Sequence, residues 1–234
     1  MDENASLKID RIAFLGRTFD EYLKIFGLDG NILREGPVLD CAAGAASFSA
    51  EARQLGIDAT ACDIMYGLPF ERLMQKGEDD LAHVFEKVRD VSHLYTWKYY
   101  KDMADVVRHR KKALDLFVRD FSKGYQDGRY VHCVLPEIPF PDGAFNLVLS
   151  GHFLFLYGDR LDLDFHKACL RELIRVTRKE VRIFPLLGLD AKPYPYMNEI
   201  LSFLDTLGVN ADIEEVHFEF FSGATRMMRM HKES

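Results

Sequence analysis

The chemistry that this sequence offers is concentrated in residues 37–48, where an apolar run ends in an acid and small residues follow. Asp40 is the acid, and the small residues are alanines around a single glycine, Gly44. A turn with so little side-chain bulk allows a flat ligand to approach the backbone closely. The stretch therefore predicts the cofactor-binding turn of an α/β enzyme.

A second group of candidates lies upstream of this turn. Residues 6–26 carry an apolar stripe at intervals of four, three and four residues, which predicts a helix that ends at Gly27. A helix directly before the first strand can cover one mouth of the cofactor cleft, where Arg17 and Tyr22 would touch the ligand. The alternative is that Tyr22 belongs to the core and that Arg17 is a solvated charge. The stripe consists of Leu15, Phe19, Tyr22 and Phe26.

The elements that must position these groups begin in strand, helix, strand order. An apolar strand at 38–41 precedes a helix at 47–55, and a second strand at 57–62 ends at Asp63. This is the compact βαβ unit of a parallel, doubly wound α/β sheet. Near the end of the chain, Ser222-Gly223 separates two strand patterns and predicts a terminal hairpin. The remaining expected elements are strands over 129–134, 145–150, 180–185, 212–221 and 224–231, and helices over 164–177 and 196–207.

Residues 66–128 interrupt this rhythm with long helical patterns in which acidic and basic residues nearly balance. A simple crossover between two strands needs only a short helix, so the segment predicts an insertion of two to four helices that forms a cap beside the site. Two stretches stand out within it. Residues 97–101 could hold an aromatic or anionic substrate, and residues 108–112 could form a partner patch. For both stretches a solvated helix face is the favoured alternative.

Length and charge limit the class of protein. The 234 residues fit a single α/β domain, 1–234, that carries an insertion. The formal net charge of -7 argues against general nucleic-acid binding, because a phosphate-tracking surface is usually basic. No apolar run approaches the roughly 20 residues that span a bilayer, and the acidic first residues carry no signal-peptide pattern. We therefore expect a soluble, cytoplasmic protein without membrane association.

The cysteines give no local sign of a metal site. No two of them have the Cys-x-x-Cys spacing that is typical of structural zinc sites, so no metal is predicted. We expect four buried thiols in a reducing compartment. They are Cys41, Cys62, Cys133 and Cys169.

Several motifs occur in an order that is specific when they are taken together. An acid and a small-residue turn follow the first strand, and Asp63 ends the second. Residues 138–148, with the sequence IPFPDGAFNLV, lead into the expected fourth strand, and residues 169–176 form the helix before the fifth. This combination resembles the class I S-adenosylmethionine-dependent methyltransferases, whose Rossmann-like sheet has seven strands and a last strand inserted antiparallel. The resemblance covers most of the chain except residues 66–128.

The resemblance implies S-adenosylmethionine as cofactor and S-adenosylhomocysteine as product. Asp40 would lie near the ammonium group, and Asp63 would accept hydrogen bonds from two ribose hydroxyls. The aspartate that often binds adenine in this family is missing after the third strand, so the backbone around Val134 and Leu135 would hold the adenine. The cofactor-binding residues that the resemblance implies are Arg17, Tyr22, Asp40, Ala42, Gly44, Asp63, Ile64, Val134, Leu135 and Ser150.

The resemblance also implies where catalysis would occur. His152 and Tyr157 would lie at the edge where the transferred methyl group sits, with His152 as a base or as a group that orients the acceptor. The alternative is that His152 packs against the cofactor or the cap. Residues 150–153 lack the motif of amino-group DNA methylases, and no cysteine follows a proline as in cytosine C5 methylases. We therefore expect an acceptor that is not DNA, most simply a small molecule. His132 lies one residue inside the expected third strand, so we expect it to be a core histidine.

The alanines of the turn depart from the family pattern, which places glycines there. Because alanine disfavours positive φ, either the turn avoids that conformation or the affinity for the cofactor is weakened. Two other functions stay open. A nicotinamide-dependent dehydrogenase would need a G-x-G-x-x-G turn, which the sequence lacks, and a methyltransferase-like module would act as a scaffold with weak or no catalysis. The sequence identifies neither the methyl acceptor nor the oligomeric state.

Overall fold

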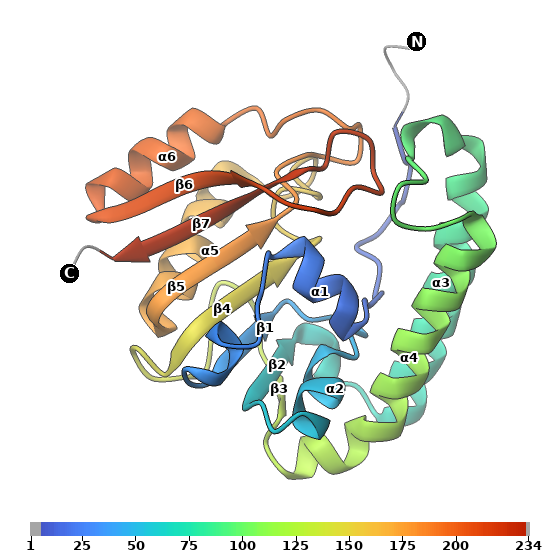
Figure 1. Ribbon diagram of the computed structural model, residues 1–234, viewed down its shortest axis with the longest axis horizontal. Helices are drawn as coiled ribbons and strands as arrows, with labels where there is room; N and C mark the ends of the chain where they lie inside the picture. The colour runs from blue at the N-terminus through green and yellow to red at the C-terminus, as the bar shows by residue number, and fades with distance from the viewer. Residues whose placement is uncertain (1–5, 233–234) are drawn as a thin grey trace.

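A computed structural model describes residues 6–232 and contains one mixed sheet of seven strands (Figure 1). Its order is β3-β2-β1-β4-β5-β7-β6, in which the first five strands along the chain run parallel and β7 is antiparallel to both of its neighbours. The predicted doubly wound, mostly parallel sheet with a terminal antiparallel hairpin is therefore confirmed. The strands are β1 (Val38–Cys41), β2 (Ala59–Asp63), β3 (Tyr130–His132), β4 (Phe145–Gly151), β5 (Thr177–Phe184), β6 (Val209–Glu215) and β7 (Arg226–Lys232).

Helices cover both faces of this sheet, because the buried strands present apolar side chains alternately to each side. Helices α1 (Phe19–Ile25) and α2 (Phe48–Gln54) pack on one face together with Val38, Leu147 and Leu149. Helices α5 (Leu163–Val176) and α6 (Met197–Thr206) pack on the opposite face with Leu39, Val148 and Val181. Three short 3₁₀ helices also occur, η1 (Ile32–Arg34), η2 (Ile64–Gly67) and η3 (Ser92–Leu94).

The predicted helical insertion consists of two long helices between β2 and β3. Helices α3 (Phe70–Asp90) and α4 (Met103–Gln126) run side by side along one flank of the molecule, on the right of Figure 1. Phe117 and Phe121 of α4 pack against Tyr130 of β3, the edge strand of the sheet. The number of helices lies within the predicted range of two to four.

The prediction of a helix over residues 6–26 is wrong for most of its length, because only Phe19–Ile25 is helical. Residues 6–17 form an extended segment, which we call the strap. Burial alternates along it, with Leu7 and Ile9 buried and Lys8 exposed, which is the pattern of an extended chain. Thr18 then starts α1 with a capping box that includes Glu21. The sequence pattern that suggested a long helix therefore combines α1 with an extended neighbour.

The terminal hairpin has shorter strands and a longer connection than predicted. Strands β6 and β7 pair from Val209↔Lys232 to Glu215↔Arg226. Ser222-Gly223 does form a turn, which the Ala224 N–H closes by donating to the Phe221 carbonyl (2.9 Å), but this turn lies outside the paired strands. Residues 216–225 form a loop instead, which we call the aromatic loop. Its Phe218 and Phe220 are buried against the cap and the core, so apolar residues that suggest a strand belong to a buried loop.

A buried carboxylate on α3 is one of the groups that hold the strap in place. Asp80 is 1 % exposed and accepts hydrogen bonds from the backbone N–H of Phe14 (2.7 Å), from Arg11 Nε (2.8 Å) and from Lys76 Nζ (2.7 Å). The backbone N–H of Ala13 donates to the Tyr157 hydroxyl (3.1 Å). These contacts connect the strap to the insertion and to the segment after β4.

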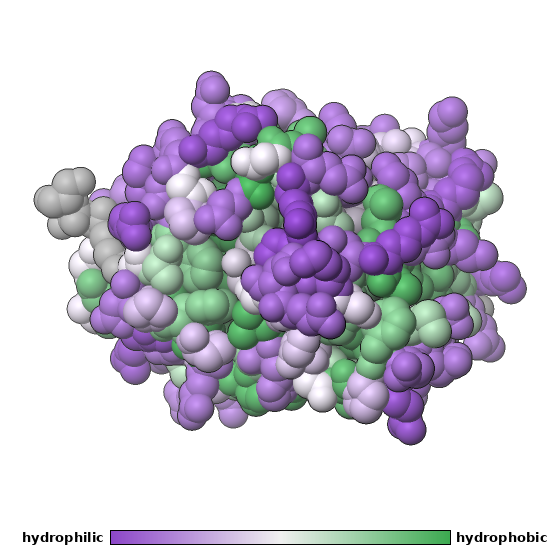
Figure 2. Space-filling view, turned by 90° about the horizontal axis from the view of Figure 1, so that it is seen from below, coloured by the Kyte–Doolittle hydropathy of each residue, from purple (hydrophilic) through white to green (hydrophobic). Residues whose placement is uncertain are grey.

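The face of the molecule seen from below is largely hydrophilic (Figure 2). Its apolar groups form patches that polar side chains interrupt. Over residues 6–232, no helix combines the length and the apolar character needed to cross a bilayer.

We expect Asp80→Asn to lower the free energy of unfolding by about 1.5 to 3 kcal/mol, because a buried carboxylate that accepts three hydrogen bonds becomes a neutral amide. The matched control is Asp79→Asn, one residue earlier on the exposed face of α3, which should change stability by less than about 0.5 kcal/mol. Urea unfolding of the two variants provides the comparison. Equal effects would show that Asp80 does not anchor the strap.

Candidate functional site

A cavity of about 390 Å³ opens at the carboxyl ends of β1, β2 and β4. Its floor is the turn after β1, and the strap, the insertion and the aromatic loop form its walls. The carboxyl edge of a parallel sheet is the usual ligand site of doubly wound folds. The predicted residues that line the cavity are Arg17, Tyr22, Ala42, Gly44, Asp63, Ile64, Val134, Leu135, His152 and Tyr157.

The turn after β1 resolves the question that its alanines pose. Within residues 42–46, Gly44 has a positive φ of 58°, and none of the alanines does. A Cβ at Gly44 would lie 2.4 Å from the carbonyl oxygen of Leu15, so glycine is needed for both conformation and space. The turn therefore uses the left-handed conformation once, at its glycine. Its alanines face no penalty from positive φ.

Asp63 joins the turn to the end of β2. One carboxylate oxygen accepts the backbone N–H of Gly44 (2.9 Å), and the other accepts that of Met65 (2.8 Å). Burial raises the pKa of Asp63 to about 6, although the two backbone hydrogen bonds act in the opposite direction. Asp63 also lines the cavity, where each oxygen retains a second lone pair for a ligand.

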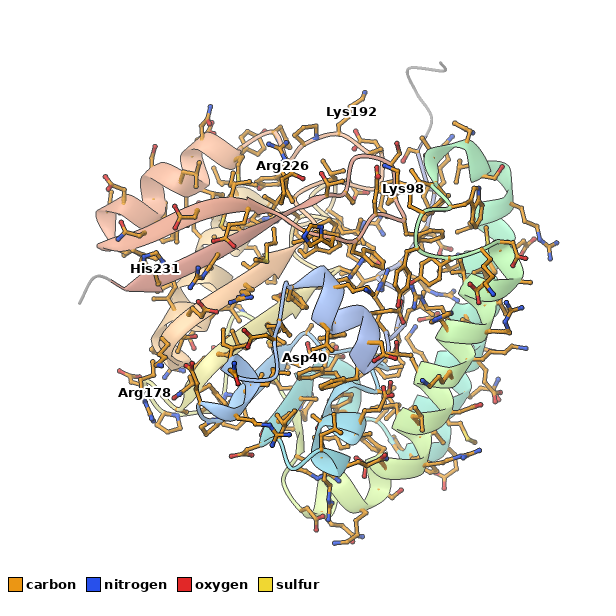
Figure 3. All side chains as sticks on the ribbon, in the orientation of Figure 1. Asp40, Lys98, Arg178, Lys192, Arg226 and His231 are labelled. Atoms are coloured by element: carbon orange, nitrogen blue, oxygen red, sulfur yellow. The ribbon has the colours of Figure 1, made fainter. Side chains whose placement is uncertain are left out.

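Asp40 lies deeper than predicted. It is 1 % exposed and does not line the cavity; Figure 3 shows it at the centre of the molecule beneath α1, far from labelled surface residues such as Lys98. One carboxylate oxygen accepts a hydrogen bond from the Tyr22 hydroxyl (2.8 Å), and the other has no partner among the described residues. Burial raises the pKa of Asp40 to about 7. Tyr22 lines the cavity, so it connects Asp40 to any ligand there.

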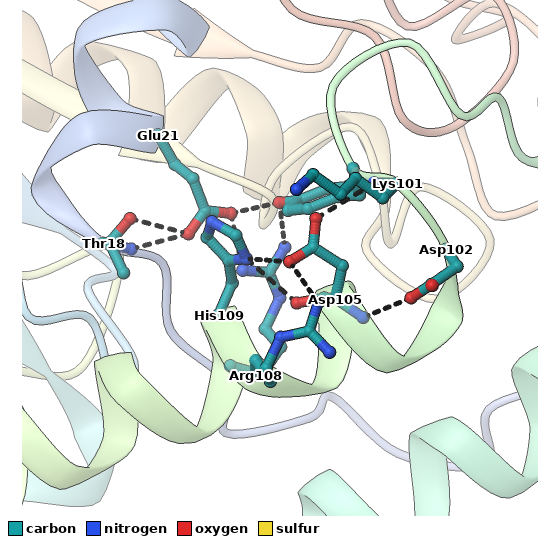
Figure 4. Close-up of polar contacts among 9 residues, drawn as sticks. Thr18, Glu21, Lys101, Asp102, Asp105, Arg108 and His109 are labelled. Atoms are coloured by element: carbon teal, nitrogen blue, oxygen red, sulfur yellow. Dashed lines mark hydrogen bonds and ion pairs between the residues drawn. The ribbon is translucent and has the colours of Figure 1, made fainter.

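A buried ionic network that the sequence did not predict lies beside the strap. Glu21 is completely buried and accepts hydrogen bonds from Arg110 Nη1 (2.6 Å) and from the Tyr100 hydroxyl. Its other oxygen accepts the backbone N–H and the hydroxyl of Thr18, both at 2.9 Å (Figure 4). Burial opposes ionisation of Glu21, but Arg110 and Arg17 outweigh it and hold the pKa at about 2. The network therefore keeps a carboxylate charged in the interior.

Arg17 is the cation of this region that lacks an acidic partner. Among the described side chains of residues 6–232, none makes a hydrogen bond or an ion pair with the Arg17 side chain, and the Nε atom of Arg17 is buried without a partner. Burial, with a contribution from Arg110, lowers the pKa of Arg17 to about 10, so the group is still charged at neutral pH. Glu21 compensates one of the two guanidinium groups. The cavity therefore presents one positive charge that an anionic ligand would neutralise.

The two predicted catalytic residues occupy different environments. Burial, with contributions from Arg17 and Arg110, lowers the pKa of His152 well below its usual value, so its ring is neutral at neutral pH. Its ring lies against Phe184 and has no hydrogen-bond partner in the described part of the chain. The Tyr157 hydroxyl is already engaged by the strap. Ser150 is buried below the cavity, and its hydroxyl has no partner in that same part.

The insertion contributes one buried charged residue, Arg110, from a stretch for which a solvated helix face was the favoured alternative. Within residues 108–112 only Arg110 is buried, and within residues 97–101 only Tyr100 is. The burial period of α4 could have identified Arg110, because it lies one turn after Val106 and one turn before Leu114 on the buried face. The prediction that His132 is a core residue is wrong, since its side chain is exposed and lies against Gly67.

The upper part of the cavity is apolar. Residues from the strap, from α3 and from the segments after β4 and β5 form one cluster there, which places apolar side chains opposite the polar floor. The cavity is therefore divided into a polar half next to the sheet and an apolar half beneath the cap. The buried members of this cluster are Leu7, Ile9, Val84, Val88, Tyr157 and Leu189.

Nearly the whole chain is similar to known proteins in both sequence and structure. The chain is 30% identical to the uncharacterized protein MJ0045 of Methanocaldococcus jannaschii over 223 residues, which are 95% of this chain and 97% of that protein. Its structure is similar to magnesium protoporphyrin IX methyltransferase from Synechocystis PCC 6803 with bound SAM, with a TM-score of 0.50, 13% identity and coverage of 92% and 78% of the two chains. The PH0226 protein from Pyrococcus horikoshii OT3 gives a TM-score of 0.50, 12% identity and coverage of 91% and 89%. No family model matches the sequence.

We expect Gly44→Ala to lower the free energy of unfolding by more than Gly128→Ala does. Both glycines have positive φ, but a Cβ at Gly128 meets no atom within 4 Å. The control should therefore cost only the conformational penalty of about 1 to 2 kcal/mol. Gly44→Ala adds the clash with Leu15 and should exceed the control by about 1 to 3 kcal/mol in urea unfolding. Equal costs would show that the strap can move away from the turn.

We expect Glu21→Gln to lower the free energy of unfolding at pH 7 by about 3 to 5 kcal/mol, because Arg110 is then buried without its charge partner. The double variant Glu21→Gln/Arg110→Met should lose less than the sum of the two single variants. The pKa of Glu21 is about 2 in the folded chain, below its ordinary 4.5, so its contribution is present above pH 4.5 and is lost as the pH falls toward 2. The difference between wild type and Glu21→Gln should therefore narrow below pH 4.5. A difference that is independent of pH would contradict this assignment.

Proposed function

Because this chain belongs to the family of the uncharacterized protein MJ0045 and has the fold of the class I S-adenosylmethionine-dependent methyltransferases, we propose that it binds S-adenosylmethionine and catalyses methyl transfer to a small molecule. The observation that carries this proposal is the polar half of the cavity. There, Asp63 and the Gly44 turn meet an unpaired guanidinium at the carboxyl edge of the sheet.

The polar groups fit the separate parts of this cofactor. Arg17 fits the carboxylate of its amino acid part, because a guanidinium can donate two parallel hydrogen bonds to a carboxylate. The Tyr22 hydroxyl, backed by Asp40, fits the ammonium group, and Asp63 fits the ribose hydroxyls. The exposed apolar side chains of Ile64 and Val134 border the same cavity and fit the faces of the adenine ring.

The bound cofactor supplies an electrophilic methyl group on a sulfonium. The chain must then align the acceptor with that methyl group and exclude water. The apolar cluster around Val84 and Val88 excludes water and favours an acceptor with a largely apolar body. The neutral ring of His152 can accept a hydrogen bond from the acceptor and so orient it, whereas its lowered pKa makes it a weak base.

Isothermal titration calorimetry with S-adenosylhomocysteine tests the cofactor part of this proposal. We expect Arg17→Gln to weaken binding by about tenfold to a hundredfold, because charge-assisted hydrogen bonds to the carboxylate are lost. Arg34→Gln is the matched control, since Arg34 lies outside the cavity on η1 and bonds the Leu55 carbonyl; it should leave the affinity unchanged. Asp63→Ala should weaken binding by more than about tenfold.

Two results would contradict the proposal at different levels. If the folded wild type does not bind S-adenosylhomocysteine at millimolar concentration, the proposed cofactor is wrong. If wild type binds and Arg17→Gln binds equally well, the cofactor stands but the role of Arg17 is wrong. Transfer of a labelled methyl group to a panel of small phenols, thiols and amines then tests catalysis.

A further inference from the structure

Three of the four cysteines converge at one point, although they are far apart in the sequence. Cys41 is the last residue of β1, Cys62 is the penultimate residue of β2, and Cys133 directly follows β3. Their sulfur atoms all lie within 4.8 Å of one another, and all three residues are buried. We propose that these three thiols form a binding site for a thiophilic d¹⁰ cation, Zn²⁺ or Cu⁺.

The position of the three sulfurs follows from the sheet. Cys41 and Cys62 are register partners on neighbouring parallel strands, so their side chains point to the same face. Cys133 follows β3, whose backbone is joined to β2 where the Cys133 N–H donates to the Asp63 carbonyl (3.3 Å). Residues at the carboxyl ends of three adjacent strands thus bring the three sulfurs to the same side of the sheet, that of α5 and α6. A site built on three paired strands is rigid before a ligand arrives.

The spacing suits a shared cation. With a metal–sulfur bond of about 2.3 Å, two thiolates on one ion are about 3.8 Å apart in tetrahedral geometry and about 4.0 Å apart in trigonal geometry. Both separations fall within the 4.8 Å limit that the three sulfurs satisfy. Soft thiolate donors select Cu⁺ and Zn²⁺ over harder ions such as Mg²⁺. Each thiol would release its proton to solvent when it binds the ion.

A disulfide explains the cluster less well. Side chains of register partners on parallel strands keep their Cβ atoms near the strand spacing of about 4.8 Å, whereas a disulfide needs about 3.8 Å. A bond between Cys41 and Cys62 would therefore pull two central strands together. It would also leave the third sulfur without a role. Packing alone does not require three thiols at one point, because a buried thiol behaves as a small apolar group.

The cluster is separate from the proposed cofactor contacts. Asp40 and Asp63 precede and follow cysteines in the chain, but alternation along a strand sends their side chains to the opposite face of the sheet. Cys133 alone of the three borders the cavity, so it provides a path for the ion to enter. Loss of the metal site would thus not by itself contradict the cofactor proposal.

The test uses the full chain, purified under reducing conditions, incubated with Zn²⁺ or with Cu⁺ under anaerobic conditions, and then desalted. Elemental analysis should find about one ion per chain for at least one of the two. Cys41→Ala, Cys62→Ala and Cys133→Ala should each lower the bound ion at least tenfold. Cys169→Ala is the matched control, because Cys169 is buried in the same apolar cluster but lies outside the group of three sulfurs, and it should retain the ion.

A measurement on wild type avoids dependence on the folding of the variants. Bound Co²⁺ should give a thiolate-to-metal charge-transfer band that Zn²⁺ abolishes by displacement, or that Cu⁺ abolishes if Cu⁺ is the preferred ion. The proposal is overturned if neither Zn²⁺ nor Cu⁺ remains bound to folded wild type. Equal loss of the ion in Cys169→Ala would also overturn it. Thiol titration of the denatured chain without added reductant gives a third test. The proposal is overturned if only two of the four thiols react, because two of the cysteines would then form a disulfide.

Discussion

The hydrogen bond from the Gly44 amide to Asp63 is the contact on which the rest of the site depends. It fixes the turn after β1 to the end of β2, and this is possible because Gly44 alone in the turn adopts a left-handed conformation. Because residue 44 has no side chain, the strap can pack against the turn. The carbonyl oxygen of Leu15 lies 2.4 Å from the position that a Cβ of residue 44 would take. One glycine therefore sets both the floor of the cavity and the path of the segment that covers it.

The two arginines at the strap, Arg17 and Arg110, differ in how their charges are compensated. A guanidinium without a partner is costly in a low-dielectric environment, and the chain reduces that cost for Arg110 by pairing it with Glu21. Arg17 has no such partner in the described structure, and it lies at the cavity, where its guanidinium is open to an anionic ligand. The same argument accounts for Asp40, whose carboxylate is supported on one side by Tyr22 and is otherwise unpaired.

The sequence predicted the sheet well because strands β1, β2 and β4 are short apolar runs next to acids or turns, and because strand, helix, strand order predicts a parallel sheet. It failed where tertiary contacts override local patterns. Residues 6–17 have apolar residues that fit a helix, but Gly16 packs directly on Ala45 and the segment stays extended. Most predicted site residues line the cavity, since strand ends converge at one edge. Arg110 and Glu21 were missed because their pairing joins positions 89 residues apart.

The strand alternation that positions the acids also explains why the cysteine cluster was not predicted. Local spacing reveals a metal site only when its ligands come from one turn or one hairpin, whereas Cys41, Cys62 and Cys133 come from three strands. At the ends of β1 and β2, an acid and a cysteine are neighbours in the chain and therefore face opposite sides of the sheet. The edge thus separates oxygen donors on the α1 and α2 side from sulfur donors on the α5 and α6 side. A cation held by the sulfurs would hold the ends of three strands together, and two of those ends carry the acids that form the polar floor.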